Sequence, residues 1–484
     1  MKKVYSLLPL LLLSLSIWGC SGGNEIEKGK EEGNSDNNIA LNFDYTRPLT
    51  DDNKVIYELN LYDFTKAGTL QAATQRLDEL NKLGIDIVWL MPIHDRGDVG
   101  KIGSLGSPYA AKDYYSVNPD FGSLDDLVSF VATAHAKSMK VLLDWVPNHT
   151  AMDAVWVKEH PEYYTQKDGV IVHPNNYGDV YQLNMNKEQT QNAMIRAMEY
   201  WIKEANIDGY RCDYIASSAI PASFWTKAIP ALKSIKSDLI MLGEADFMDA
   251  KRLFNTGFNY DYAWKFHDQL KNIGTSADAA ALKKAAQELV DNSNYTQMDR
   301  MVYLTNHDDN ENNFRSNYIQ YMGNNRYPLT VLEFTLYGMP LLYNGQENGY
   351  TKVMNYFERE PINWDEVDAK MNNTVRSLVA LRHTSKALSS GIAENRAKVE
   401  FLTVSHPSVL AYKKVKDGEE VLVVLNLGGQ SVQVTIDGIT TGTYIQWIDS
   451  RTIQTRTDGK EINLSTSSKI SLESKGYAVF VLKR

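Results

Sequence analysis

Short apolar runs alternate with longer amphipathic stretches from about residue 54 to about residue 390, and this alternation most limits the possible folds. IDIVWLMP (85–92) is a continuous apolar run, typical of a strand buried on both faces of a parallel sheet. TLQAATQRLDELNKLG (69–84) has helical periodicity and ends at Gly84. Eight such strand–helix units favour an α/β fold, a closed (β/α)8 barrel of the TIM-barrel type, over an open sheet. The predicted strands are 55–61, 85–92, 140–146, 207–214, 239–245, 257–262, 301–308 and 340–347, and the predicted helices are 69–84, 124–139, 187–206, 224–236, 280–292, 329–338 and 373–385.

Two parts of the chain depart from this alternation. The connection between the third and fourth predicted strands, at about 147–186, is long and irregular, which indicates a small inserted subdomain. After about residue 391 the pattern changes to short strands separated by turns, and residues 391–484 therefore predict a C-terminal all-β sandwich. The barrel is expected to span residues 41–390, with the inserted subdomain within it.

Residues 1–20 have the pattern of a bacterial lipoprotein signal peptide. MKK is a short basic start, and the apolar run VYSLLPLLLLSLSIW that follows is too short for a comfortable membrane span and leads to Gly19 and Cys20. We expect lipid on Cys20 to anchor the mature chain in the bacterial cell envelope, at a periplasmic or surface face of the membrane; an ordinary secretory signal with an incidental cysteine is the alternative. Residues 21–40 are rich in glycine, asparagine and charge, and they predict a flexible tether.

Charge and cysteine content exclude some classes of protein. The net charge is −10 and the pI is about 5.5, which argues against a nucleic-acid-binding protein, because such proteins show a basic patch or stripe. The chain has two cysteines, so lipidation of Cys20 would leave Cys212 without a partner for an internal disulfide. We expect a monomer.

Polar and charged residues gather where the predicted strands end. In (β/α)8 barrels the carboxyl ends of the strands line the active site. Charges packed this closely reduce stability, so proteins usually keep them for function. The sequence therefore predicts an active site at this rim. The residues concerned are Asp144, Asn148 and His149 at the third strand, Arg211 and Asp213 at the fourth, Glu244 at the fifth, and Asn306, His307 and Asp308 at the seventh.

The segment GYRCDY (209–214) places an arginine two residues before an aspartate. Side chains alternate along a strand, so Arg211 and Asp213 should share one side, towards the barrel mouth. Cys212 should point the other way, into the layer between sheet and helices, as a small apolar filler rather than a nucleophile. A partly buried salt bridge is the structural alternative to a catalytic role. By charge proximity, Arg211 should lower the pKa of Asp213 and keep it ionised, as a nucleophile requires.

Four ordered segments carry a resemblance to a known family. DWVPNH (144–149), GYRCDY (209–214), GEA (243–245) and TNHD (305–308) resemble the signature regions of glycoside hydrolase family 13, the α-amylase family. IYELNLYDF, GSPYAAKDYYSVNPDFGSLDDL and YNGQE are similar to the family's first strand, second loop and last strand. The likeness extends from about residue 54 to the C-terminus.

The resemblance implies a catalytic set and a mechanism. Asp213 would be the nucleophile, Glu244 the general acid/base, and Asp308 would stabilise the distorted sugar in the transition state. Retaining glycosidases hold the nucleophile and the acid roughly 5–5.5 Å apart. Burial and neighbouring negative charge should raise the pKa of Glu244 and keep it protonated. Arg211 should keep Asp213 ionised, so that Asp213 serves as the nucleophile and Glu244 as the acid.

The resemblance also implies substrate-binding and bracing residues. His149 and His307 would hydrogen-bond the sugar in the cleavage subsite, with Tyr109 as the platform beneath it and Arg211 beside it. For each, a satisfied core residue is the alternative. Asp113, Asp144 and Glu347 would brace the structure rather than contact substrate.

Two departures from the family pattern bear on function. Many α-amylases follow the nucleophile with a lysine and a histidine, whereas residues 215–218 here are IASS, which puts a typical leaving-group subsite in doubt. No cofactor is required, but a structural calcium ion is possible because Asn148 matches a position that often ligates it. Gln182 stands where an aspartate often supplies a partner, and Asp179 is a possible substitute.

The main hypothesis is a lipid-anchored hydrolase of α-1,4-linked glucans or maltooligosaccharides. A cyclomaltodextrinase or neopullulanase-like enzyme, an α-1,6 debranching enzyme and a transglycosylase share the same chemistry. A non-catalytic starch-binding protein is a different class, and the intact Asp/Glu/Asp set argues against it. A metal-dependent hydrolase using HDDNE (307–311) ranks last, because the sequence shows no second ligand cluster.

Overall fold

The structure is a computed structural model, and it describes most of the chain after residue 50. The predicted signal peptide, Cys20 and the predicted tether at 21–40 lie outside the described residues. No helix in the described part is both long enough and apolar enough to cross a membrane. The described ranges are 51–175, 177–293, 298–311, 318–392, 395–451 and 459–483.

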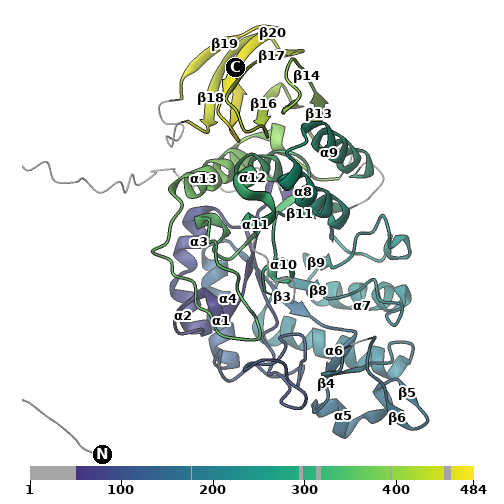
Figure 1. Ribbon diagram of the computed structural model, residues 1–484. Helices are drawn as coiled ribbons and strands as arrows, with labels where there is room; N and C mark the ends of the chain where they lie inside the picture. Colours follow the sequence, from purple (N-terminus) through teal and green to yellow (C-terminus); the bar gives the residue numbers. More distant parts are fainter. Residues whose placement is uncertain are drawn as a thin grey trace, which may run out of the picture. The chain divides into compact units, whose positions relative to one another are not determined.

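Within these ranges, eight parallel strands close into a barrel, as the alternating pattern predicts (Figure 1). Each predicted strand is present, and the first pairs with both the second and the last, which closes the ring. The barrel strands are β1 (Ile56–Leu59), β2 (Ile87–Leu90), β3 (Lys140–Trp145), β8 (Gly209–Cys212), β9 (Ile240–Gly243), β10 (Tyr260–Tyr262), β11 (Asp299–Val302) and β12 (Met339–Tyr343).

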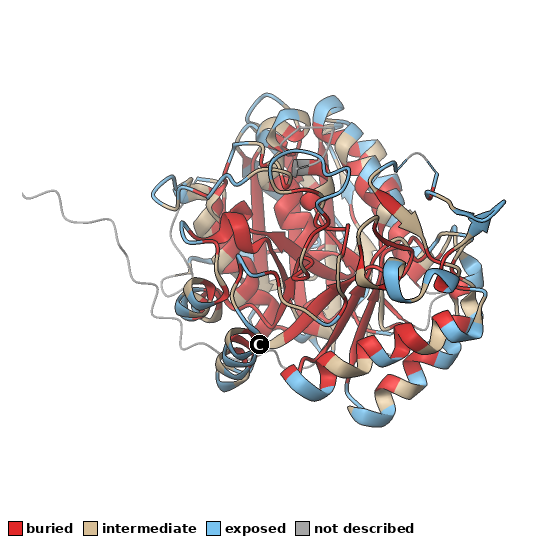
Figure 2. Cartoon of the chain, turned by 90° about the horizontal axis from the view of Figure 1, so that it is seen from below, coloured by how far each residue is buried: buried red, intermediate tan, exposed pale blue. Residues whose placement is uncertain are grey.

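Helices surround the barrel, and Figure 2 shows their buried inner faces and exposed outer faces around the buried strands. Two details differ from the prediction. The single helix expected at 69–84 is broken at Arg76, which caps the end of one helix and the start of the next. A helix at Trp264–Ser276 has no predicted counterpart. The larger helices are α2 (Leu70–Gln75), α3 (Leu77–Leu83), α4 (Leu124–Ala136), α6 (Glu188–Ala205), α7 (Ala222–Ile235), α8 (Trp264–Ser276), α9 (Ala279–Ser293), α12 (Arg326–Thr335) and α13 (Ala369–Thr384).

Short elements fill the connections. The predicted insertion after β3 contains two small antiparallel ribbons, β4 with β7 and β5 with β6. Its elements are β4 (His149–Ala151), α5 (Val155–Glu159), β5 (Gln166–Lys167), β6 (Val170–Ile171) and β7 (Val180–Gln182). Elsewhere lie α1 (Leu61–Phe64), α10 (His307–Glu311), α11 (Tyr318–Met322) and the 3-10 turns Asp51–Asn53, Pro161–Tyr163, Lys251–Leu253, Gly323–Asn325, Gln346–Asn348 and Lys386–Leu388.

The C-terminal part is all β, as predicted, and forms a six-stranded and a three-stranded antiparallel sheet. Val424 and Ile436, one from each sheet, belong to one apolar cluster, so the sheets share a core. One strand, Glu461–Leu464, has no predicted counterpart. The strands are β13 (Lys398–Phe401), β14 (Thr403–Val404), β15 (Val409–Lys416), β16 (Glu419–Asn426), β17 (Val432–Asp437), β18 (Gly442–Asp449), β19 (Glu461–Leu464), β20 (Ser467–Leu472) and β21 (Tyr477–Leu482).

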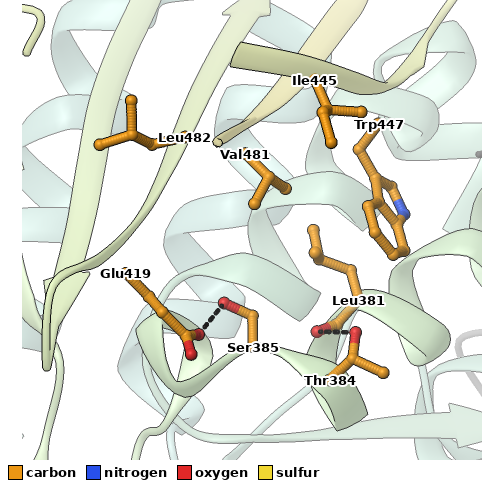
Figure 3. Close-up of a pocket in the computed structure, with 8 residues that line it drawn as sticks. All are labelled: Leu381, Thr384, Ser385, Glu419, Ile445, Trp447, Val481 and Leu482. Carbon is orange, nitrogen blue, oxygen red and sulfur yellow. Dashed lines mark hydrogen bonds between the residues drawn. The ribbon is translucent and has the colours of Figure 1, made fainter. Parts of the chain in front are cut away.

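The six-stranded sheet packs against the end of α13 and the turn that follows it. Trp447 donates from its indole nitrogen to the Ser377 carbonyl at 2.9 Å, which ties β18 to α13. A cavity of about 210 Å³ lies at this seam (Figure 3), where Ser385 donates to Glu419 at 3.2 Å. None of the predicted catalytic residues lines this cavity.

Candidate active site

One arginine contacts three carboxyl groups at the rim of the barrel. Nη1 of Arg211 donates to Asp144 Oδ1 at 2.9 Å and to Asp213 Oδ1 at 3.1 Å. Nη2 of the same side chain lies 3.1 Å from Glu244 Oε1. Because β3, β8 and β9 are neighbours in the barrel, their carboxyl ends bring these side chains together. Asp213 and Glu244 therefore lie against the same guanidinium group, of which the sequence predicts the contact with Asp213.

A glycine allows this close approach. Gly209 begins β8 with φ at +148°, and a Cβ atom there would lie 1.9 Å from the Ile240 carbonyl oxygen of β9. A side chain would therefore push β8 and β9 apart. After Asp213 the chain turns at Tyr214, which has φ at +47°, an unusual value for a residue other than glycine. The Tyr214 N–H donates to Glu244 Oε2 at 2.6 Å, so this strained turn holds the carboxyl of Glu244 beside Asp213.

The pKa values of Asp213 and Glu244 correct one prediction. Burial, and then the charge of Glu244, raise the pKa of Asp213 well above its ordinary value, although Arg211 lowers it. The predicted effect of Arg211 is confirmed in direction, but desolvation outweighs the single cation, so the pKa of Asp213 is raised overall and the expectation of a net lowered pKa is wrong. Burial likewise raises the pKa of Glu244, and the charge of Asp308 adds to this, as predicted. Because Arg211 contacts both carboxyl groups, its presence alone does not decide which of them is the nucleophile and which is the acid.

The two contacts of Arg211 differ in geometry. The contact with Asp213 is an aligned hydrogen bond. The contact with Glu244 is close, but Nη2 forms no hydrogen bond. The side chain of Asp213 is 12% exposed and that of Glu244 is 7% exposed, whereas Asp144 is completely buried. Asp144 thus holds the arginine from below, and the other two carboxyls face the opening.

His307 begins α10 and links the other side of the site. Its Nδ1 lies 2.5 Å from Glu58 Oε1, and its Nε2 lies 2.6 Å from the Tyr109 hydroxyl and 3.5 Å from Asp308 Oδ1. Burial lowers the pKa of His307, but the charges of Asp308 and Glu58 outweigh this and raise it to about 10. The imidazole is therefore a cation that can donate from both nitrogens. Tyr109 in turn donates to Asp144 Oδ2 at 3.2 Å, which joins both halves of the site.

His149 differs from His307 in charge. Burial lowers the pKa of His149 to about 4, so its ring is neutral at pH 7. Nδ1 lies 3.1 Å from Nδ2 of Asn148, and the ring of Tyr177 stacks on it at 6.5 Å between ring centres. Tyr177 is 55% exposed and comes from the inserted subdomain. The two histidines thus enter the site with different charges.

Four further residues form part of this site and were not predicted from the sequence. Glu58 on β1 is buried beneath His307, and Trp89 on β2 donates to Asp144 Oδ2 at 3.1 Å. The Tyr262 hydroxyl on β10 accepts from Arg211 Nε at 3.0 Å, and Tyr177 covers His149. A carboxylate inside the apolar strand IYEL was the one available signal, because such a residue needs a buried partner.

The remaining predicted residues lie away from the cluster of acids. Cys212 is fully buried within the apolar layer between barrel and helices, on the side that the alternation predicts. Asp113 accepts from the N–H of Tyr115 at 3.0 Å within its own loop. Glu347 accepts from the Tyr57 hydroxyl at 2.9 Å. These contacts suit bracing of the backbone.

The residues around Asn148 do not fit a calcium ion. Nε2 of Gln182, a hydrogen-bond donor, points at Asn148 Oδ1 from 3.2 Å and at the Asn148 carbonyl oxygen from 2.6 Å. Calcium prefers several oxygen ligands, commonly carboxylates. Across the described ranges, no group of three histidine, cysteine, aspartate or glutamate side chains could hold a metal ion.

The fold and the site together define a class of enzyme. A closed parallel barrel with two adjacent carboxyl groups at its rim has the arrangement that glycoside hydrolases use. Residues 33–182 and 175–387 match the family described as alpha amylase, catalytic domain, and residues 399–466 match maltogenic amylase, C-terminal domain. The chain belongs to the α-amylase family and is a glycoside hydrolase, as the resemblance implies.

Three known proteins show the extent of the likeness. Alpha-amylase MalA of Haloarcula japonica is 27% identical over 438 residues, which are 86% of this chain and 61% of that protein. A cyclomaltodextrinase from a Bacillus species is 26% identical over 74% of this chain and 65% of its own length. The crystal structure of AmyB, a noncanonic maltogenic alpha-amylase from Thermotoga neapolitana, has a TM-score of 0.75 at 25% identity and covers 90% of this chain and 99% of its own.

Proposed function

We propose that this enzyme hydrolyses α-glucosidic bonds, mainly α-1,4, in starch-derived glucans or maltooligosaccharides, with retention of anomeric configuration. The observation that carries the proposal is the contact of Asp213 and Glu244 with one guanidinium group at the barrel rim. A retaining mechanism needs two carboxyl groups close together, and inverting enzymes hold theirs farther apart. The family membership and the named relatives support the α-glucan substrate.

In this mechanism Asp213 attacks the anomeric carbon while Glu244 gives a proton to the departing glycosidic oxygen. Burial raises both pKa values, so the pair favours a state with one proton. The aligned hydrogen bond from Arg211 stabilises the anion on Asp213, whereas Glu244 receives no hydrogen bond from it. The mechanism requires this proton to start on Glu244, although the Tyr214 N–H donates to Glu244 Oε2 at 2.6 Å and burial raises the pKa of Asp213 as well. Water then cleaves the glycosyl ester while Glu244 takes a proton back.

The other predicted residues bind the sugar at the cleavage point. Asp308 places negative charge beside the developing positive charge of the sugar ring. The cationic His307 donates from Nε2 to the Tyr109 hydroxyl and brings positive charge to the site, and Tyr109, stacked on it at 5.3 Å, forms part of the floor. Neutral His149 offers the sugar a further hydrogen bond. Arg211 orients the nucleophile rather than the substrate.

The experiment that tests this proposal separates products by size and by anomer. The purified enzyme is incubated with starch, pullulan, cyclodextrins and short maltodextrins, and the products are sized by chromatography. Proton NMR of the first product formed from maltopentaose reports its anomeric configuration. The α-anomer is expected, and initial release of the β-anomer would exclude the double displacement. A failure to cleave any of the α-1,4-linked substrates would exclude the substrate class.

A cyclomaltodextrinase-like specificity is a second candidate. The segment at 215–218 lacks the lysine and histidine that many α-amylases place on the leaving-group side, and one relative is a cyclomaltodextrinase. Such an enzyme would cleave cyclodextrins faster than starch. Action on α-1,6 bonds would appear as maltotriose released from pullulan, whose maltotriose units are joined by α-1,6 bonds, and transglycosylation as products longer than the substrate.

We also propose that the enzyme is a lipid-anchored protein of the bacterial cell envelope. The support is the sequence alone: the basic start, the apolar run and Cys20, followed by the polar stretch 21–40. Cells that express the full chain and grow with labelled palmitate should incorporate label into the wild type and not into Cys20→Ser. Equal labelling of both would exclude Cys20 as the lipidation site.

A further inference from the structure

Three oxygen atoms converge on the side-chain amide of Gln182. Its Nε2 lies 2.6 Å from the Asn148 carbonyl oxygen, 3.1 Å from the Leu183 carbonyl oxygen and 3.2 Å from Asn148 Oδ1. Asn148 follows β3 of the barrel and Gln182 ends β7 of the inserted subdomain. The amide thus joins the barrel to the insertion. Asn148 is fully buried and Gln182 is partly buried.

Converging oxygens of this kind are the environment of a hard cation, yet the group at their centre is a hydrogen-bond donor. Calcium takes six to eight oxygens at about 2.3–2.6 Å, and charged ligands tighten its binding. Here the three oxygens are neutral, and the primary amide brings two N–H groups that the acceptors can share. An amide nitrogen and a calcium ion cannot occupy the same place.

We propose that the Gln182 amide takes the place of a bound cation at this junction, so that the folded enzyme needs no calcium there. The amide donates to Asn148 Oδ1 and to the Leu183 carbonyl oxygen and shares the Asn148 carbonyl oxygen with a backbone donor, and satisfying these oxygens is the structural task that a cation would perform. Further contacts hold the same junction. The Leu183 N–H donates to the Asn148 carbonyl oxygen at 3.1 Å, and β7 pairs with β4 with Gln182 opposite His149.

The arrangement extends to the active site. Asn148, whose carbonyl and side-chain oxygens accept from Gln182, places its Nδ2 3.1 Å from Nδ1 of His149. The position of the His149 ring is therefore fixed through a chain of amides. The proposal concerns how the junction is held, and it stands whether or not the proposed substrate is correct.

Thermal unfolding with calcium chloride as the probe tests this inference. The melting temperature of the wild type and of Gln182→Glu is measured in EDTA and again in excess calcium chloride. Glutamate keeps the shape but places a carboxylate among three oxygens, so in EDTA it should melt lower by about 5 °C. Calcium should restore much of that loss, because the variant offers four oxygens including a charged one, and should not shift the wild type.

Gln166→Glu is the matched control. Gln166 lies in the same insertion, is exposed, and donates to the Pro161 carbonyl at 2.8 Å. The Gln166→Glu variant adds the same charge outside the junction, and its melting temperature should respond to calcium as that of the wild type does. A calcium shift in the wild type as large as that in Gln182→Glu would overturn the proposal, as would equal stability of the two proteins in EDTA.

A second variant keeps the proposal testable should Gln182→Glu fail to fold. Gln182→Met has a similar length and neither donates a hydrogen bond nor carries charge. It should melt below the wild type and respond to calcium as the wild type does. A calcium response present in the wild type and lost in Gln182→Met would show a cation at the junction and would overturn the inference.

Discussion

Arg211 and Arg300 are two buried arginines of the same barrel that each contact more than one carboxylate. Arg300, on β11, donates to both oxygens of Asp261 at 2.9 and 3.0 Å and to Asp246 Oδ1 at 2.6 Å. Backbone N–H groups complete this cluster, with Phe247 donating to Asp261 at 3.0 Å. Asp261 is completely buried. The side chain of Asp246 is 5% exposed, so the Arg300 cluster differs chiefly in hydrogen bonding: both oxygens of Asp246 and both oxygens of Asp261 accept hydrogen bonds from protein donors.

The Arg211 cluster has the same kinds of group in a different state. Asp144 is enclosed in it, but Asp213 and Glu244 retain exposed surface and face the opening. The guanidinium lacks an aligned hydrogen bond to Glu244. The comparison shows that buried charge alone does not indicate catalysis. What distinguishes the Arg211 cluster is that two of its acids are not fully occupied by protein donors and can still react with a ligand.

The largest expected effect is on turnover. Asp213→Asn should lower kcat by at least about 10⁴-fold, because the amide cannot act as the nucleophile. Binding of maltooligosaccharides should persist, since the side chain keeps its shape. The release of reducing sugar measures the rate, and calorimetry measures the binding. Asp261→Asn is the control from the Arg300 cluster, and the folded fraction of this variant should keep a kcat near the wild-type value. A wild-type rate in Asp213→Asn would falsify the role of Asp213.

The second largest expected effect is a loss of stability when Arg300 is replaced. Arg300→Met leaves Asp246 and Asp261 buried without their cation, and it should lower the free energy of unfolding by about 3–5 kcal/mol. Urea unfolding followed by circular dichroism measures this change. A loss below about 1 kcal/mol, the size of a surface ion pair, would contradict the structural role given to this cluster.

Neutralising one acid in each cluster should change stability in opposite directions. Burial and Glu244 raise the pKa of Asp213, so its ionised form destabilises the fold progressively as pH rises above the ordinary value of an aspartate. At pH 7, Asp213→Asn should therefore raise the free energy of unfolding by about 1 kcal/mol. Burial also raises the pKa of Asp261, to about 6, but its two oxygens accept three hydrogen bonds from protein donors. Asp261→Asn replaces one of these oxygens with a donor, and this loss should outweigh the removal of the buried charge and lower the free energy of unfolding by about 1–3 kcal/mol. Changes of the same sign in urea unfolding would remove the distinction between the clusters.

The smallest effect concerns the pH dependence that Glu58 confers. The His307 pKa of about 10 lies above the ordinary 6.5, so its protonation stabilises the fold fully below pH 6.5 and this contribution is lost as pH rises towards 10. Glu58→Gln removes one of the two charges that raise this pKa. The wild type should therefore lose more stability between about pH 7 and about pH 9 than the variant, by roughly 1 kcal/mol. Parallel unfolding curves at both pH values would exclude the coupling.

The barrel was predictable because its strands are apolar runs of the right length, and because helical periodicity separates them. The elements that escaped prediction did so for different reasons. Glu461–Leu464 is a short edge strand, whereas WKFHDQLKNIGTS, the sequence of α8, does carry Phe266, Leu270 and Ile273 at helical spacing and could have been found from that pattern. The break at Arg76 lies inside a continuous helical pattern, and its place is set by the tertiary contacts of that arginine with Phe64 and Trp364.

At the site, the residues carried by the motifs were predictable, whereas their partners were not. The sequence places Arg211 near Asp213, but its contacts with Asp144 and Glu244 depend on which strands are neighbours and on their register. The direction of the Asp213 pKa shift depends on burial, which no local pattern reports. Glu58 acts through His307, almost the whole length of the barrel away in sequence, and the two meet only because the ring closes.

That closure has a consequence for how the molecule is made. Ile56 of β1 pairs with Leu341 of β12, so the first strand to be synthesised waits for one of its two neighbours until the last strand has been synthesised. In that interval the nascent chain carries an apolar strand with one open edge, the kind of surface that recruits other chains. Contacts between such distant residues also slow folding. Correct folding of this enzyme therefore requires that synthesis of the polypeptide be completed before its first barrel strand associates with other chains.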